Sequence, residues 1–272
     1  MGPLVATTLL AACGTQPVHA AARSAPPASA PTVTPAPTSP PPTPTSPPPR
    51  PVRVVGLGDS VTSGEHCACD DYVTGFGHLL QARDGVRVHV TNDGESGSTS
   101  DGLARDLRTE DDLRADVGRA DVVVVTTGAN DLAPALAAWR SGGCPRSCSD
   151  PEIATMRVDL GRVLDTVDRL DGARGRVLVT TYWNVFTDGD VARKAERPGY
   201  LAWSDSVTRR ANVAITQVAA AHGATLVDLY APFKGDGGDD PTGLLARDGD
   251  HPDAAGTALI SRTVLTAYEA GR

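Results

Sequence analysis

Residues 121–126 read Asp-Val-Val-Val-Val-Thr, and this stretch decides the fold. Its four consecutive valines show no polar alternation, which predicts a strand covered on both faces, as in the centre of a parallel sheet. Similar short runs rich in β-branched residues lie on either side of it. We expect five strands, over residues 53–57, 86–91, 121–126, 176–181 and 225–229.

Amphipathic stretches of helical length alternate with these strands, at residues 72–82, 103–117, 153–170, 203–222 and 254–268. Strands that alternate with helices form βαβ units, in which the strands run parallel and helices cover both faces of the sheet. The sequence therefore predicts an α/β fold, a doubly wound three-layer α/β/α sandwich with a five-stranded parallel sheet. Sites in such sheets form beyond the carboxyl ends of the strands.

Residues able to carry chemistry follow the predicted strands at this carboxyl edge. Nucleophilic acyl transfer needs a hydroxyl, a base with an orienting carboxylate, and donors for an oxyanion. Four blocks contain those groups in chain order: Gly58-Asp59-Ser60, Gly97, Gly128-Ala129-Asn130-Asp131 and Asp248-Gly249-Asp250-His251. Each block alone has an ordinary structural explanation, such as a serine that caps a helix, so the inference depends on all four together.

Ser60 is the candidate nucleophile, and it needs a base because a serine hydroxyl is weakly nucleophilic until its proton is accepted. His251 differs from the other five histidines in having a carboxylate three residues before it and a proline directly after it. Asp248 is expected to hold the tautomer of the His251 ring. Asp250 is the alternative, but a residue directly before a histidine points its side chain elsewhere in most backbone conformations.

The chain resembles the SGNH hydrolases of the GDSL esterase and lipase family over residues 51–272. The first block of that family is matched by Gly58-Asp59-Ser60 and the third by Gly128-Ala129-Asn130-Asp131. Residues 92–99, Asn-Asp-Gly-Glu-Ser-Gly-Ser-Thr, match the second block, and residues 248–252, Asp-Gly-Asp-His-Pro, match the fifth. The resemblance implies a flavodoxin-like fold, which agrees with the sheet expected from the strands.

The same resemblance implies a serine ester hydrolase that works through an acyl-enzyme, without a metal or an organic cofactor. The oxyanion donors would be the backbone N–H groups of Ser60 and Gly97 and the side-chain amide of Asn130. The family includes lipases, small-ester esterases, thioesterases and enzymes that deacetylate carbohydrates. The substrate could therefore be a small-molecule, lipid or glycan ester. A non-catalytic glycan-binding module of the cell envelope on the same fold is the alternative.

Three aromatic residues follow the fourth predicted strand at the same edge, namely Tyr182, Trp183 and Phe186. They could line an acyl pocket or pack in the core. Other ligand-binding motifs fail: Gly56-Leu57-Gly58 begins like a dinucleotide loop, but Val61 stands where a third glycine is needed. A Gly-x-Ser-x-Gly nucleophile elbow is also missing from the sequence.

Composition separates the chain into a proline-rich part and one globular domain. Residues 1–50 contain no Asp or Glu and many of the 22 prolines, whereas residues 52–272 hold all 33 acidic residues. An acidic domain argues against nucleic-acid binding, which requires clustered positive charge. Residues 25–51 are rich in Pro, Thr and Ser, which predicts a disordered linker that favours extended polyproline II and acts as a semi-rigid spacer.

The amino terminus predicts export. Residues 1–12 are apolar, and Leu10-Ala11-Ala12-Cys13 resembles the lipobox of bacterial lipoproteins, which implies a leader within residues 1–24 and lipidation of Cys13. No Lys or Arg precedes the apolar run, so an ordinary signal peptide is the alternative. We expect an extracellular or cell-envelope protein that is a monomer. Its membrane contact would be limited to a lipid anchor at the outer face of the membrane.

The globular domain contains four cysteines, Cys67, Cys69, Cys144 and Cys148, and an even number in an exported protein predicts two disulfides. A Cys67–Cys69 bridge would close a very tight ring. We therefore favour pairs between the two clusters or a local Cys144–Cys148 bridge. A metal site formed by His66, Cys67, Cys69 and Asp70 is the disfavoured alternative, because this spacing matches none of the standard zinc patterns.

Overall fold

The computed structural model describes residues 50–145, 147–172 and 174–271. The chain divides into two units, Met1–Pro47 and Pro48–Arg272, and the fold described here is that of the second unit. The predicted leader with Cys13 and nearly all of the predicted linker lie outside the described residues, so these expectations stay predictions.

A five-stranded parallel sheet forms the centre of this unit. Its strand order is β2-β1-β3-β4-β5, which confirms the expected α/β fold. Each predicted strand overlaps an observed one; the observed strands are β1 (Val52–Gly58), β2 (Val88–Gly94), β3 (Val122–Thr126), β4 (Arg176–Thr180) and β5 (Thr225–Val227).

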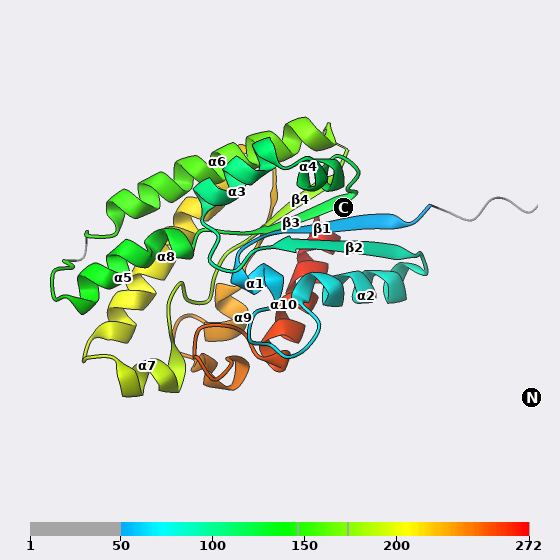
Figure 1. Ribbon diagram of the computed structural model, residues 1–272. Helices are drawn as coiled ribbons and strands as arrows, with labels where there is room; N and C mark the ends of the chain where they lie inside the picture. The colour runs from blue at the N-terminus through cyan, green and yellow to red at the C-terminus, as the bar shows by residue number, and fades with distance from the viewer. Residues whose placement is uncertain (1–49, 146, 173, 272) are drawn as a thin grey trace, which may run out of the picture. The chain divides into compact units, whose positions relative to one another are not determined.

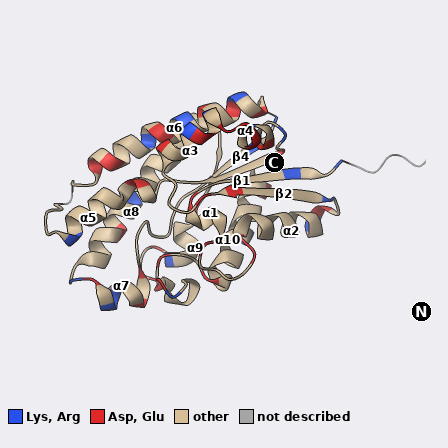
Figure 2. Cartoon of the chain, in the orientation of Figure 1, with Lys and Arg blue, Asp and Glu red and all other residues tan. Residues whose placement is uncertain are grey.

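Helices cover both faces of the sheet and complete the three layers (Figure 1). On one face α2 (Tyr72–Asp84) packs against α10 (Ala254–Ala270). On the other face α6 (Asp150–Asp171) packs between α3 (Ser100–Thr109) and α8 (Tyr200–Ala221). Figure 2 shows charges of both signs along the outer helix α6, whereas the strands inside are largely uncharged.

The helix expected over residues 103–117 is in fact two helices, α3 and α4 (Asp111–Val117). Glu110 separates them, because its backbone is extended at φ −97° and ψ 113°. Buried apolar residues continue on both sides of this break, at Leu107 and Leu113. A hydrophobic pattern therefore could not reveal a single extended residue.

Several short elements near the carboxyl edge were not expected from the sequence, because one or two turns are too short for a hydrophobic period. The segment of residues 232–250 is also partly helical. These elements are α1 (Ser60–Ser63), α5 (Ala133–Arg140), α7 (Gly189–Ala195), α9 (Tyr230–Lys234) and the 3-10 turns Asn130–Leu132 and Pro241–Leu244.

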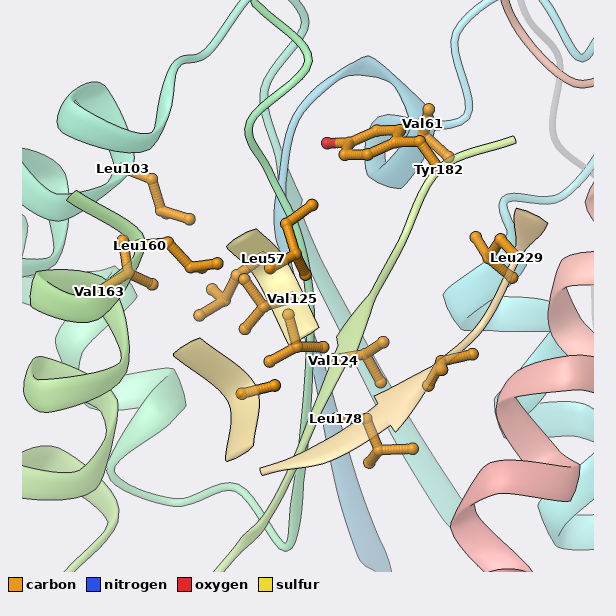
Figure 3. Close-up of a cluster of buried hydrophobic side chains, with 14 of the residues drawn as sticks. Leu57, Val61, Leu103, Val124, Val125, Leu160, Val163, Leu178, Tyr182 and Leu229 are labelled. Atoms are coloured by element: carbon orange, nitrogen blue, oxygen red, sulfur yellow. The ribbon is translucent and has the colours of Figure 1, made fainter. Parts of the chain in front are cut away.

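The core lies on both sides of β3, whose valines are at most 1% exposed. Successive side chains of a strand point to opposite faces, so a strand covered on both sides needs apolar residues at every position. Figure 3 shows part of this core, in which Leu57 and Val125 of the sheet lie near Leu103, Leu160 and Val163 of the covering helices. The uninterrupted valines thus explain why β3 is central.

None of the helices within the described part of the chain has the length and apolar character needed to cross a membrane.

Candidate active site

The end of β1 places Ser60 at the carboxyl edge of the sheet. Gly58 has φ +139°, a conformation that glycine adopts readily, and the next N–H, of Asp59, donates to Thr126 O of β3 at 3.0 Å. The Asp59 carboxylate accepts from Val61 N at 3.0 Å and so caps α1. Ser60 is therefore the first residue of a short helix that begins directly beyond the sheet.

His251 and Asp248 meet Ser60 at this edge. The Ser60 Oγ lies 2.8 Å from His251 Nε2, and His251 Nδ1 lies 2.5 Å from Asp248 Oδ2. The other oxygen of Asp248 accepts from the backbone N–H groups of Asp250 and His251, at 3.1 and 3.2 Å. Hydroxyl, imidazole and carboxylate thus form one chain of hydrogen bonds, as general-base activation of a serine requires.

The two neighbouring aspartates differ in their surroundings. Burial acts to raise the pKa of Asp248, but the hydrogen bonds from the His251 ring and from two backbone N–H groups outweigh it and lower the pKa. Burial raises the pKa of Asp250, and in the described part of the chain the His251 ring nitrogens hydrogen-bond to Asp248 and Ser60 and not to the Asp250 carboxylate. The geometry therefore supports Asp248, and not Asp250, as the partner of the imidazole.

The loop that carries His251 is held by backbone hydrogen bonds. Ala246 N donates to His251 O at 2.8 Å, and Asp188 N donates to Gly249 O at 2.7 Å. Asp253 ends the loop by capping α10, because its carboxylate accepts from two N–H groups of the first turn. These bonds limit the movement of the imidazole relative to Ser60.

Asp188 belongs to a buried charge network that no sequence motif indicates. Its carboxylate accepts from Lys234 Nζ at 2.8 Å and from Asn184 Nδ2 at 2.9 Å. Lys234 also lies 3.3 Å from Asp205 Oδ1, so the buried ammonium group has two carboxylate partners. The charged members of this network, Asp188, Asp205 and Lys234, are far apart in the chain, and no local sequence signal links them.

The loop after β2 places Gly97 between the first and third blocks. The hydroxyls of Ser63 and Ser96 hydrogen-bond at 3.1 Å, and Asn130 Nδ2 donates to Ser98 O at 2.9 Å. Gly97 has φ +82°, and no described atom lies within 4 Å of the place where a Cβ would stand. Its left-handed backbone thus requires glycine, and the space beside it is open.

Asp59 and Asp131 support the loops around the site. Asp131 accepts from Ser100 N at 2.9 Å and from Ser100 Oγ at 2.5 Å, which joins the third block to the start of α3. Burial raises the pKa of Asp131. Burial also raises the pKa of Asp59 to about 6, although hydrogen bonds from Tyr182 and Val61 oppose the rise.

The three aromatic residues after β4 are buried in the core. Tyr182 donates from its hydroxyl to Asp59 Oδ2 at 2.5 Å, and Trp183 stacks on Phe233 with ring centroids 4.4 Å apart. Phe186 stacks on an aromatic residue of α8. Each of the three is at most 3% exposed. Of the two expected roles, the structure therefore favours packing over an open acyl pocket.

Glu65 and His66 lie beside the site, although no motif of the sequence indicates this. The rings of His66 and His251 are 5.0 Å apart, and His66 Nε2 lies 3.7 Å from Asp248 Oδ2. Glu65 Oε2 lies 3.9 Å from His251 Nε2. The nearness of this loop to Ser60 in the sequence was the one signal that could have pointed to it.

The structure pairs Cys67 with Cys69 and Cys144 with Cys148. The first pair corrects our expectation that so tight a ring would not close. His66 and Ala68 have φ of 62° and 54°, and these left-handed conformations curl the chain until the Cα atoms of Cys67 and Cys69 are 5.1 Å apart. Both sulfurs of the disfavoured Cys-containing metal site are therefore used in a bridge.

The sequence matches the model of the GDSL-like lipase/acylhydrolase family over residues 57–259. The chain belongs to this family. Membership makes the protein a hydrolase of ester bonds, and the match covers all four blocks that meet at the carboxyl edge. No curated protein matches the chain.

Solved structures of this GDSL-like fold resemble the chain over most of its length. The lipase Lip_vut3 from a goat rumen metagenome has a TM-score of 0.67 at 19% identity, with 79% of this chain and 97% of that chain covered. A lipase/acylhydrolase from Enterococcus faecalis has a TM-score of 0.55 at 22% identity, with 80% and 96% covered. An acetyl xylan esterase from Geobacillus stearothermophilus has a TM-score of 0.53 at 19% identity, with 79% and 94% covered.

Proposed function

We propose that this GDSL-like hydrolase is a serine esterase that cleaves carboxylic esters through an acyl-enzyme formed on Ser60. The observation that carries the proposal is the continuous set of contacts from Ser60 Oγ to His251 Nε2 at 2.8 Å and from His251 Nδ1 to Asp248 Oδ2 at 2.5 Å. A non-catalytic module has no physical need for a hydroxyl, a base and an orienting carboxylate in this geometry.

In the first half of the reaction, His251 Nε2 accepts the proton of Ser60 while Oγ attacks the ester carbonyl carbon. The Asp248 carboxylate stabilises the imidazolium that forms and keeps its Nδ1 proton in place. The carbon–oxygen bond to the alcohol then breaks, and His251 gives its proton to the leaving alcohol. An acyl group remains on Ser60 as an ester.

The negative oxygen of the tetrahedral intermediate needs hydrogen-bond donors. The backbone N–H groups of Ser60 and Gly97 and the side-chain amide of Asn130 would supply them. Asn130 Nδ2 gives one N–H to Ser98 O, and an amide nitrogen carries a second N–H that can serve the oxyanion. The bond to Ser98 fixes the amide in advance, as preorganised stabilisation requires.

In the second half, a water molecule takes the place of the alcohol. His251 Nε2 removes one proton from the water, and the resulting hydroxide attacks the acyl carbonyl. The bond to Ser60 Oγ then breaks, and His251 returns the proton to Oγ. The products are a carboxylic acid and the regenerated hydroxyl, and the proposed steps require no metal or organic cofactor.

We further propose a glycan or lipid ester with a short acyl group as the substrate, and a place of action outside the cell. The hydroxyls of Ser63 and Ser96 hydrogen-bond to each other, Ser96 and Ser98 flank Gly97 in the chain, and the nearby aromatic side chains are buried in the core. The proline-rich segment would act as a spacer behind a leader or a lipidated Cys13. The similar fold of an acetyl xylan esterase supports a glycan ester.

The test is hydrolysis of p-nitrophenyl esters of graded acyl length by the full chain and by Ser60→Ala. Ser206→Ala is the matched control, because Ser206 is an exposed serine of α8. We expect turnover of the acetyl ester by the wild type and by Ser206→Ala, and its loss in Ser60→Ala. Equal rates in all three proteins would exclude Ser60 as the nucleophile.

The acyl-length series tests the substrate. Rates that fall steadily from acetyl to longer acyl groups would support the short-acyl proposal, whereas a maximum at long chains would indicate a lipase. A folded wild type without activity on these esters or on acetylated xylan would favour the glycan-binding alternative.

A further inference from the structure

Four side chains from two separate loops converge beside the proposed nucleophile. Glu65 and His66 come from the loop after α1, and Asp248 and His251 from the loop before α10. One ligand atom each of His66, Asp248 and His251 lies within 4.8 Å of the other two. We call these three residues, with Glu65, the His66 cluster.

Asp248 Oδ2 is the shared point of the cluster. It lies 2.5 Å from His251 Nδ1 and 3.7 Å from His66 Nε2. Glu65 Oε1 lies 3.3 Å from His66 Nε2, so a second carboxylate faces the same imidazole. Two imidazole nitrogens and two carboxylate oxygens therefore meet in one small, partly open space.

The backbone holds His66 in this place. Its φ of 62° lies in the left-handed region, which is uncommon for residues other than glycine but in which histidine is enriched. The next residue, Cys67, accepts a hydrogen bond from Thr257 Oγ1 of α10 at 3.3 Å. This bond links the His66 loop to α10, the helix that begins just after His251, and so keeps His66 close to the site.

We propose that the His66 cluster binds a divalent cation of the zinc type, and that the bound ion switches off the esterase. Imidazole nitrogen and carboxylate oxygen are zinc ligands, with bonds of about 2.0–2.2 Å. Tetrahedral bonds of that length place ligand atoms about 3.3–3.6 Å apart. The distances of 3.3 Å and 3.7 Å around His66 Nε2 lie near this spacing, whereas Asp248 Oδ2 and His251 Nδ1, now 2.5 Å apart, must separate to bind one ion.

The inhibition rests on the proposed function and follows from the change of tautomer that the ion imposes on His251. An ion that binds His251 Nδ1 takes the lone pair of that nitrogen, and Asp248 Oδ2 changes from hydrogen-bond acceptor to metal ligand. The neutral ring has one N–H proton, which must then move from Nδ1 to Nε2. Nε2 faces Ser60 Oγ at 2.8 Å and can no longer accept the serine proton.

Binding is tested without any substrate, by calorimetric titration of zinc chloride into the metal-free full chain and its variants. His66→Asn removes the imidazole and suits the left-handed backbone, because asparagine tolerates that region. His89→Asn is the matched control: His89 is exposed and lies on β2, opposite Arg53 of β1 and away from the carboxyl edge. Ser60→Ala keeps the whole His66 cluster.

We expect one zinc ion per chain in the wild type, in Ser60→Ala and in His89→Asn. In His66→Asn the Kd should rise by at least about tenfold, since even the loss of a residue that only supports a metal ligand costs about 10- to 100-fold. Magnesium should not compete, because imidazole-rich sites favour zinc over hard cations. Equal zinc affinity in His66→Asn and the wild type, or no zinc binding at all, would overturn the proposal.

The effect on catalysis is measured as the rate with zinc divided by the rate of the same protein without zinc. Zinc should abolish turnover in the wild type, a chelator should restore it, and His66→Asn should need at least about tenfold more zinc. If calorimetry shows zinc on the cluster and no ester is cleaved, the binding proposal stands and the esterase proposal fails. Full activity of the zinc-loaded wild type would refute the inhibitory role.

Discussion

Asp248→Asn tests the proposed role of this carboxylate, because asparagine keeps the loop geometry and reverses one hydrogen bond. Asp248 Oδ1 accepts from two backbone N–H groups, and the amide oxygen of asparagine can accept both. The amide NH₂ then stands in place of Oδ2, 2.5 Å from His251 Nδ1. That nitrogen must become an acceptor, so the ring proton moves to Nε2, which faces Ser60.

The size of the effect follows from this change of tautomer. A base that carries its proton on the wrong nitrogen lowers kcat by about 10⁴-fold in Ser-His-Asp hydrolases. This loss corresponds to a rise of about 5 kcal/mol in the activation free energy. The fold should survive, because Asp248 is partly exposed and its backbone contacts remain.

The assay compares kcat of the full chain, Asp248→Asn and Asp250→Asn on p-nitrophenyl acetate at neutral pH. Asp250→Asn removes the same charge two residues away and should keep kcat within about tenfold, a change of less than about 1.4 kcal/mol. Thermal unfolding checks that all three proteins are folded. Similar losses of kcat in both variants, or a loss below tenfold in Asp248→Asn, would refute the reasoning.

Three further predictions concern the oxyanion donor, a buried carboxyl group and a backbone position. Asn130→Ala should lower kcat by about 10²–10³-fold, because one donor is lost, and an unchanged kcat in steady-state kinetics would remove Asn130 from the oxyanion site. Burial raises the pKa of Asp59 to about 6, so between about pH 4 and 6 the folded protein holds a proton that the unfolded chain has lost. The free energy of unfolding of the wild type should therefore fall by about 3 kcal/mol relative to Asp59→Asn as the pH rises from about 4 to above 6. Urea unfolding across that range measures this difference, and a pH-independent difference would contradict the assignment. Gly58→Ala should lower the free energy of unfolding by at least about 3 kcal/mol in the same assay, because a Cβ at this position, where φ is +139°, would overlap Thr126 O. A loss below about 1 kcal/mol, the size of an ordinary substitution, would show that the strands can separate there.

Local patterns were sufficient for the sheet and for most of the site. The run of valines at residues 122–125 predicts a strand covered on both faces, and the structure buries all four. The rule that parallel strands end at a common edge then brings Ser60, Gly97 and Asn130 to that edge, because each follows a strand directly. The Asp248–His251 spacing within one loop completes this set.

The parts that the sequence did not reveal depend on contacts between distant segments. The break at Glu110 interrupts a hydrophobic pattern that continues on both sides of it. The Cys67–Cys69 bridge depends on left-handed backbone at His66 and Ala68, and the local sequence does not specify that conformation. The Lys234–Asp188 pair is buried between segments that are 46 residues apart.

The sequence by itself determined the layered fold, the edge at which the candidate active site lies and most of the residues that meet there, because periodicity and chain order set the direction of each strand. Only the tertiary structure decided what else reaches that edge. The aromatic side chains after β4 turn into the core, and the loop after α1 brings His66 to Asp248. The physical reason is that side-chain direction and loop path depend on packing against residues far away in the chain, and local sequence carries no record of that packing.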